Sequence, residues 1–408
     1  MFYNVYMKWS DENFEIRKLI AAISSQENND EKTKYFSYNS YWLNDFSMIY
    51  VDMQNGIDNT VYLNKFANLN YELNSLYSSN KLLCFNNQVL ANCLLYQPTI
   101  IKYQVCISFD LNIVSQLRYL NNKINSDEVL KNVEDICKSQ ECSFDIMPYI
   151  IENYCKDINN LGINKETFED IKNFETMFPF KNYKEETNPI SLEERIKKLT
   201  SFYQSKKFKT TSLYLYKEIY EVEYTYLLAI VFIYLKYIKL SSNHKLEKFY
   251  EFCNNYIKAF HPCSCNLAKL FYENNALKFF RHIQKNNKNI IQDIKNMAWD
   301  LFHLRFMEKS LGFSHTDPEI IMIPIFISKD KGLNEIRKAY QVNCVFKNLK
   351  TRQCFFNYAI NPITKNTEKY FTNIDLMRKR METDHNFKKL SKNIEGMILS
   401  EIQSQNQN

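Results

Sequence analysis

The chain has 408 residues, of which 45% are hydrophobic and 15% aromatic, so it is not a disordered protein and its length predicts more than one folded unit. Its formal net charge of +6 lacks the strong basic excess of a dedicated DNA-binding protein, so a nucleic-acid partner is permitted but not required. The 11 cysteines are scattered singly and no secretory leader pattern is seen, so we expect reduced thiols and a cytoplasmic location.

Residues 1–99 alternate polar stretches with short apolar patches, and we expect them to form an N-terminal accessory region. Leu69, Leu73, Leu76 and Tyr77 recur at helical spacing, which predicts a helix over 68–80. A second helix is predicted over 82–95. No feature of this region indicates a function.

From residue 100 the pattern becomes that of an α/β unit. The β-branched and aromatic run 100–109 predicts a buried strand that ends at Asp110, and apolar residues at helical spacing follow it. A helix is predicted over 126–138. Pro148 suits the first turn of a further helix that carries Glu152.

The segment from about 160 to 285 is predicted to be almost wholly helical. Its most apolar run, 224–235, is shorter than a bilayer span, so we expect a buried helix and no membrane partner. The sequence His-Pro-Cys-Ser-Cys at 261–265 lacks the second half of a zinc site.

The residue pattern predicts a helix over 290–311. The apolar run 320–328 predicts a second buried strand, which is followed by Asp330. A helix over 331–339 and a strand over 341–346 are expected next. Beyond residue 372 the chain is charged and poor in aliphatic residues, and we expect the polar end, 403–408, to be frayed.

Acidic residues follow both predicted strands, and ligand sites of open α/β sheets lie at that edge. Asp110 and Asp330 are these acids, while Glu152 and Asp300 lie on neighbouring predicted helices. Carboxylates that are held close together repel one another, and a hard divalent cation relieves the repulsion. Mg²⁺ and Mn²⁺ take such oxygen ligands and support phosphodiester hydrolysis.

Four segments resemble the PIN-domain nucleases, an α/β/α family in which acids from strand ends and adjacent helices chelate Mg²⁺ or Mn²⁺. ISFDLN at 107–112 resembles the opening strand with its first acid, and MPYIIE at 147–152 resembles the approach to the helical glutamate. NMAWD at 296–300 is similar to the later helix with its aspartate. IFISKDK at 325–331 is similar to the strand that ends in Ser/Thr-x-Asp.

The resemblance implies a three-layer α/β/α domain with a mostly parallel sheet, divided into 100–159 and 289–347 by a helical insertion at 160–288. A C-terminal extension, 348–408, follows. It also implies a Mg²⁺- or Mn²⁺-dependent endoribonuclease in which Asp110, Glu152, Asp300 and Asp330 are metal ligands and catalytic residues. Ser328 would be a supporting hydroxyl.

Each acid also has an ordinary interpretation. Asp110 fits a helix N-cap, and Asp330 fits a turn before Lys-Gly. Glu152 fits a solvated helix position, with Asp157 as the nearest substitute. Asp293 lies one heptad before Asp300 on nearly the same helix face, so either can be the residue that faces the site.

The alternative to an enzyme is a catalytically inactive protein that binds other proteins or nucleic acid. Single-stranded DNA is the alternative to RNA as the substrate. Lysine-rich stretches at 206–209 and 285–288 suit a nucleic-acid backbone but are more often solvated faces. The aromatic helices of the insertion are a candidate surface for a protein partner or a second copy, and His303 and Arg305 are expected to be ordinary helix side chains.

Overall fold

In the computed structural model, the described residues are 11–26, 28–54, 56–58, 72–79, 81–96, 102–115, 142–156, 164–177, 191–284, 286–313, 320–361, 363–372, 380, 383 and 385–406. They form a mixed α/β structure. The strands are β1 (Phe46–Val51), β2 (Ile57–Asp58), β3 (Glu72–Ser75), β4 (Lys81–Asn86), β5 (Lys102–Phe109), β6 (Cys142–Asp145), β7 (Ile320–Ser328), β8 (Val342–Asn348) and β9 (Cys354–Tyr358).

The helices are α1 (Asp11–Ser24), α2 (Asn29–Tyr38), α4 (Asn87–Leu94), α5 (Leu111–Val114), α8 (Met147–Lys156), α9 (Lys165–Met177), α10 (Leu192–Gln204), α11 (Leu213–Lys236), α12 (Ser242–Phe252), α13 (Pro262–Glu273), α14 (Ile290–Phe313), α15 (Lys331–Ile336), α16 (Lys369–Thr372) and α18 (Phe387–Asn406). Short π- or 3-10-helical turns are η2 (Phe208–Ser212), η3 (Cys253–Ile257), η4 (Lys278–Phe280) and η5 (Arg337–Ala339).

One sheet has the strand order β3-β7-β5-β6. β5 is parallel to both β6 and β7, and Ile107 pairs with Phe144 on one side and with Ile325 on the other. β3 lies antiparallel to β7 at the sheet edge. The strands predicted over 100–109 and 320–328 are confirmed as β5 and β7. Because β5, β6 and β7 are parallel, their carboxyl ends meet at the same sheet edge.

The second sheet is antiparallel, with the order β2-β4-β1-β8-β9. It joins strands from the first hundred residues to strands beyond residue 341. The predicted helix over 68–80 is wrong where the structure describes it, because β3 and a bridge at Tyr77 occur there. The predicted helix over 82–95 is also wrong in its first half, where β4 precedes α4. β3 pairs with β7 and β4 pairs with β1, and these non-local pairings determine that both segments are strands. The spacing of the leucines gives no sign of such pairings.

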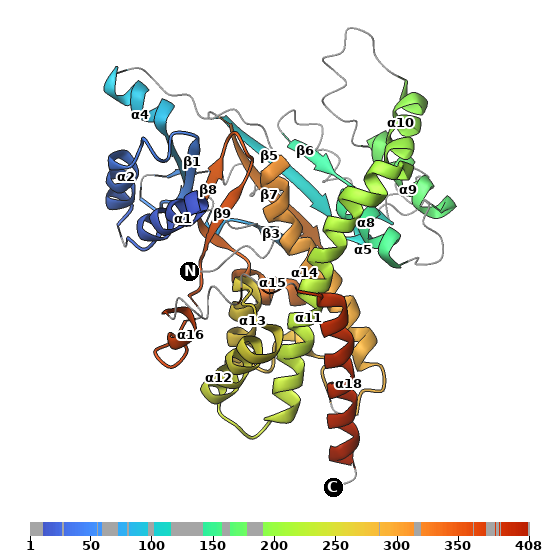
Figure 1. Ribbon diagram of the computed structural model, residues 1–408. Coiled ribbons are helices and arrows are strands. Elements are labelled where there is room, and N and C mark those ends of the chain that lie inside the picture. Colours follow the sequence, from blue (N-terminus) through green and yellow to red (C-terminus); the bar gives the residue numbers. More distant parts are fainter. Residues whose placement is uncertain are drawn as a thin grey trace.

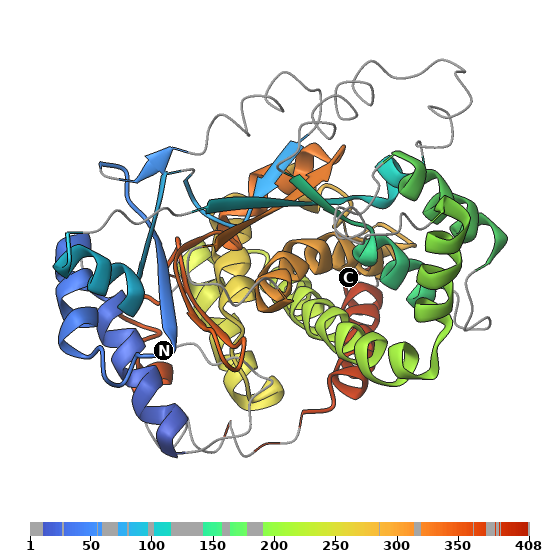
Figure 2. The same ribbon diagram turned by 90° about the horizontal axis from the view of Figure 1, so that it is seen from above.

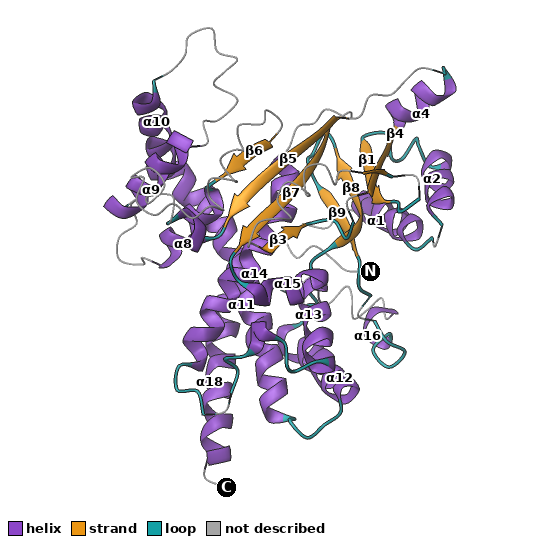
Figure 3. Ribbon diagram, turned by 180° about the vertical axis from the view of Figure 1, so that it is seen from behind, coloured by secondary structure: helices purple, strands orange, loops and turns teal. Residues whose placement is uncertain are grey.

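Helices cover the sheets in separate groups. Figure 1 shows α1 and α2 beside β1, where Ile23, Phe36 and Met48 share a small buried cluster. Figure 2 shows α14 on one face of the β3-β7-β5-β6 sheet and α11 beyond it. In Figure 3 the helices α11, α12, α13 and α18 form a part of the molecule away from the strands. The helical character predicted for 160–288 is therefore confirmed for its described residues.

The long helix α11 lies at the centre of this helical part. The apolar run 224–235 is almost wholly buried in it, and α18 packs along its length (Figure 1). Ile394 and Ile398 of α18 are fully buried. The helix continues to Asn406, so the prediction that the chain is frayed from residue 403 is wrong for residues 403–406. Packing of these isoleucines against α11 orders a segment whose composition is polar.

Within the described residues, the structure contains no helix with the length and apolar character that crossing a membrane requires. The helix predicted over 126–138 and the fallback acid Asp157 lie outside the described residues.

Candidate metal centre

Asp110 lies directly after β5, at the edge where the parallel strands end. It occupies the N-cap position of α5, yet its side chain makes no capping hydrogen bond. Instead, its Oδ2 atom accepts a hydrogen bond of 3.0 Å from the Ser328 hydroxyl, and Asn112 donates to the same oxygen at 3.4 Å. The carboxylate is buried. The contacts of the Asp110 side chain therefore differ from those of an ordinary helix cap.

Ser328 connects the ends of the two central strands. Its hydroxyl donates to Asp110 and accepts a 3.0 Å hydrogen bond from the backbone N–H of Asp330. Asp330 in turn caps α15, because its Oδ1 atom accepts a 2.7 Å hydrogen bond from the Gly332 N–H. This hydrogen bond is the one that the turn interpretation of Asp330 predicts. The buried Ser328 hydroxyl therefore links the side chain of Asp110 to the backbone of Asp330.

Glu152 projects from α8, whose first turn contains Pro148 as the sequence predicts. Both of its carboxylate oxygens have partners. His303 Nε2 lies 2.9 Å from Oε2, and Lys156 Nζ lies 2.5 Å from Oε1. His303 is 1% exposed, and its ring stacks on Phe326 of β7 with a centroid distance of 4.8 Å. The glutamate is thus held between two helices and the sheet.

Asp293 and Asp300 have different surroundings although both lie on α14. Asp293 Oδ2 accepts a 2.7 Å hydrogen bond from the Asn287 side chain at the start of the helix. Asp300 is half-buried, and its pKa is raised well above the ordinary range by burial and by the negative charges of Asp110, Glu152 and Asp330. Asp300 is therefore the α14 acid that lies within electrostatic range of the other three.

The pKa shifts of the other acids reflect the same crowding. Burial raises the pKa of Asp110, and the Glu152 charge adds to this, while His303 and the Ser328 hydrogen bond oppose it. Burial also acts to raise the pKa of Glu152, but the hydrogen bond and charge of His303, with Lys156, outweigh it and the pKa is lowered. His303 thus acts on both Asp110 and Glu152, while Lys156 acts on Glu152 and Asp300.

The donor set suits a hard cation in its chemistry, since it consists of carboxylates with an excess of negative charge. The side-chain positions are not those of a closed metal site: the described part of the chain contains no group of three or more His, Cys, Asp or Glu residues placed to hold a metal ion. Lys156 and His303 occupy the two oxygens of Glu152.

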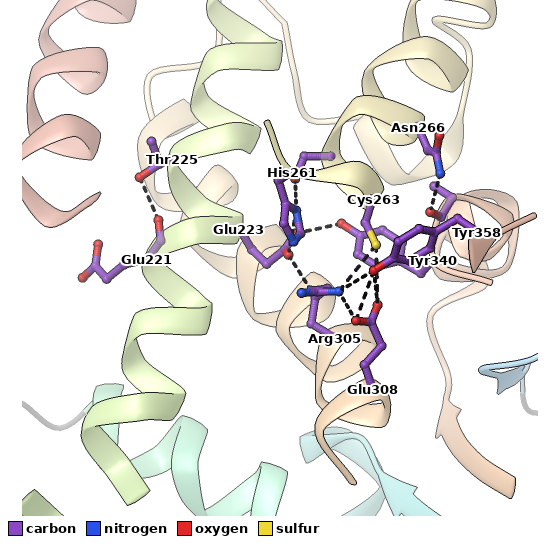
Figure 4. Close-up of polar contacts among 12 residues, drawn as sticks. Glu221, Glu223, Thr225, His261, Cys263, Asn266, Arg305, Glu308, Tyr340 and Tyr358 are labelled. Carbon is purple, nitrogen blue, oxygen red and sulfur yellow. Dashed lines mark hydrogen bonds and ion pairs between the residues drawn. The ribbon is translucent and has the colours of Figure 1, made fainter. Parts of the chain in front are cut away.

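A second polar cluster surrounds Arg305, one and a half turns after Asp300 on α14 (Figure 4). We call it the Arg305 network. Arg305 Nε lies 3.3 Å from Glu223 Oε1, and its Nη1 atom pairs with Glu308 and donates a 3.1 Å hydrogen bond to the Tyr358 hydroxyl. The Tyr340 hydroxyl donates to Glu223 at 2.9 Å, and the Tyr358 hydroxyl donates to Glu308 at 3.1 Å.

The Arg305 network joins parts of the chain that are far apart in sequence. Glu223 lies on α11, Arg305 and Glu308 on α14, and the tyrosines follow η5 or lie on β9, while His261 lies 3.5 Å from Glu223. Burial raises the pKa of Glu223 to about 7, against the effect of Arg305. Burial also lowers the pKa of His261, and Arg305 adds to this. The network ties the helical insertion to α14.

Sequence reasoning missed the roles of Lys156 and His303 and the whole Arg305 network. Lys156 follows Glu152 by four residues, so helical spacing gave a signal for this ion pair. No local pattern indicates that His303 contacts Glu152, 151 residues earlier. His303 and Arg305, which we expected to be ordinary helix side chains, are both buried and both bind acids.

Comparison with known proteins found no match among protein-family models, curated proteins or solved structures. The resemblance to PIN-domain nucleases therefore rests on the four short segments of the sequence. The class that the fold and the site themselves define is a mixed α/β protein with an acidic centre at the carboxyl edge of a mainly parallel sheet.

Proposed function

We propose that the protein is a PIN-like, metal-dependent endonuclease, and that RNA is its substrate. The observation that carries the proposal is the placement of Asp300: a helix far along the chain brings this acid into the field of Asp110, Glu152 and Asp330. These residues come from two strand ends and two helices, in the order that the resemblance implies. A three-layer α/β/α arrangement of the core belongs to the same proposal.

Asp110, Glu152, Asp300 and Asp330 would hold Mg²⁺ or Mn²⁺ through their carboxylate oxygens. When bound, such an ion activates water and neutralises charge on a phosphodiester. The roles of the protein's own groups follow from their contacts. Ser328 orients Asp110 and the backbone of Asp330, and His303 keeps one oxygen of Glu152 in place.

Four carboxylates bind a cation without reading a base, so the preference for RNA over single-stranded DNA comes from the resemblance. A cytoplasmic location and a protein partner or second copy at the helical insertion are further parts of the proposal. The surface of the insertion that would meet such a partner includes the exposed rings of Phe202 and Tyr214.

Cleavage assays test the proposal directly. The wild-type protein should cleave a single-stranded RNA in the presence of Mn²⁺ or Mg²⁺ and not in the presence of EDTA. Asp110→Asn should reduce the rate by about 100-fold or more, because one ligand is lost. Asp293→Asn is the matched control on α14 and should retain nearly the wild-type rate. Equal cleavage by wild type and Asp110→Asn would refute the assignment.

A catalytically inactive binding protein is the second candidate, and the engagement of Glu152 favours it. Both oxygens of this carboxylate are satisfied by side chains of the protein itself, as in a purely structural ion pair. Titration with Mn²⁺ separates the candidates. Absence of binding at millimolar Mn²⁺ would support the inactive protein, and saturable binding that Asp110→Asn abolishes would support the nuclease.

A further inference from the structure

Exposed basic side chains gather on α15 and on η4, the short turn that packs against it. Lys331 begins α15 and Lys338 lies in η5, which follows it, while Lys278 begins η4 and Arg281 follows that turn. All four residues are exposed. We call them the α15–η4 basic surface. Within the described residues, none of the three lysines forms an ion pair, so their charges are available to a partner.

Packing brings together the two segments of this surface, which are far apart in the sequence. Gly332 lies against the backbone of Phe279, where a Cβ atom on the glycine would be 3.0 Å from the Phe279 N and Cα atoms. The backbone N–H of Lys278 donates a 2.6 Å hydrogen bond to the Glu335 carboxylate. Residues four apart share a helix face, so Lys331 lies on the same face of α15 as Glu335. Lys331 and Lys278 therefore lie on neighbouring parts of one surface.

The α15–η4 basic surface has an excess of positive charge. The described residues between 277 and 289 include three Lys or Arg residues and no Asp or Glu. In α15 and η5 the one acidic residue is Glu335, whose carboxylate accepts the Lys278 N–H. The large hydrophobic side chains of these turns are buried, namely Phe279, Phe280, Leu333 and Ile336. The surface therefore presents charge without exposed rings or large aliphatic side chains of its own.

The place of this surface in the fold connects it to the acidic centre. Lys331 directly follows Asp330, the acid after β7, and Figure 3 shows α15 beside β3 of the same sheet. A phosphodiester is negative, so the carboxylates of the centre repel it. Positive charge beside the centre offsets this repulsion and raises the local concentration of a polyanion. The basic surface thus lies where a phosphodiester chain that reaches the acids needs compensation.

We propose that the α15–η4 basic surface binds the phosphate backbone of a single-stranded nucleic acid that leads to the acidic centre. This inference rests on the proposed function, because it names the surface that holds the proposed substrate. Lysine binds phosphate as a point charge, and neutralised phosphates release counter-ions, so the binding weakens as salt is added. A protein interface has a largely apolar core with few charged residues, and this surface offers no such core.

The experiment measures binding of fluorescein-labelled oligouridine to the full-length protein by fluorescence anisotropy, at several salt concentrations. EDTA is present throughout, so that neither metal binding nor cleavage enters the measurement. The surface variant combines Lys278→Gln, Lys331→Gln and Lys338→Gln. The matched control removes three exposed lysines from other elements through Lys206→Gln, Lys207→Gln and Lys239→Gln. Circular dichroism of each variant checks that it is folded.

We expect the surface variant to bind oligouridine at least about tenfold more weakly than wild type at low salt. The slope of log affinity against log salt should become shallower by about 2, because about three phosphate contacts are lost. The control variant should change affinity by less than about threefold. Glu335→Gln removes the acid and keeps a hydrogen-bond acceptor, so it should tighten binding by about threefold, a gain that misfolding does not produce.

The inference is wrong if wild type does not bind oligouridine, if the surface variant binds as well as wild type, or if the control loses as much affinity. Equal competition by polyglutamate would also overturn it, because an acidic protein would then fit the surface as well. The proposed function fails in a different way. A wild-type protein that binds oligouridine through these lysines but does not cleave it with Mn²⁺ is a binding protein, and its basic surface stands.

Discussion

Helix α14 contributes to two charged clusters that differ in how far cations of the protein offset their carboxylates. In the Arg305 network, one guanidinium lies between Glu223 and Glu308, and two tyrosine hydroxyls donate hydrogen bonds to these carboxylates. Around Asp300, the charges of three other carboxylates act on this residue, and the Lys156 ammonium pairs with one of them, Glu152. The first cluster has one guanidinium for two carboxylates and the second has one ammonium for four, so the second has the larger excess of negative charge.

The difference shows how charge balance separates a structural cluster from a candidate functional one. In a buried ion pair the opposite charges offset one another, and removal of either partner leaves a charge buried without compensation. An excess of like charge costs free energy unless a proton or cation binds. The Arg305 network therefore suits a role in joining the helical insertion to α14, while the cation proposed for the acidic centre would offset its negative charge.

The largest effect is expected in the compensated cluster. Arg305→Met removes the cation and leaves Glu223 and Glu308 buried without their partner, which should cost about 3–5 kcal/mol of unfolding free energy. Urea unfolding followed by circular dichroism measures this. Arg281→Met, at an exposed arginine, should change the unfolding free energy by less than about 0.5 kcal/mol. A loss below about 1 kcal/mol for Arg305→Met would show that the network is not needed for stability.

A smaller effect of opposite sign is expected in the acidic centre. Asp300→Asn removes a carboxyl group whose ionisation is opposed by burial and by three other acids, so in EDTA at neutral pH it should stabilise the protein by about 1 kcal/mol. The matched variant Asp293→Asn lies outside this group of charges and should not stabilise it. Destabilisation by Asp300→Asn would mean that the carboxylates do not repel one another in the folded protein.

The pH dependence of this effect follows from the raised pKa of Asp300. The folded state binds the proton more tightly than the unfolded state, whose Asp pKa is about 3.9. Wild-type stability should therefore fall, through this group, as the pH rises from about 4 through the raised pKa, and Asp300→Asn should lack this fall. Urea unfolding of both proteins across this range in EDTA measures the difference. Parallel curves would contradict the origin assigned to the pKa shift.

Local patterns in the sequence predicted the elements that carry the acids. Runs of β-branched and aromatic residues predicted β5 and β7, and apolar residues at helical spacing predicted α14. The local residue pattern of each segment agrees with the element that it forms. β3 was missed because its pairing with β7 joins residues more than 240 positions apart, while its leucines happen to suit a helix. The role of the four acids remains a prediction.

Contacts between distant helices explain what the sequence did not reveal around these acids. Glu152 and His303 meet only because α8 and α14 pack on the same sheet, and Glu223 reaches Arg305 from another helix. No periodicity encodes such a pair. The choice between Asp293 and Asp300 also depended on the helix start, where Asn287 binds the first of them.

The most direct test of the central claim is the unfolding free energy of the wild-type protein with EDTA and with millimolar Mn²⁺. A cation that binds only the folded state at 100 times its dissociation constant should raise this free energy by about 2.7 kcal/mol. We predict an increase of this order for wild type and none for Asp300→Asn. Identical unfolding curves for wild type in EDTA and in Mn²⁺ would contradict the claim that the four acids form a cation site.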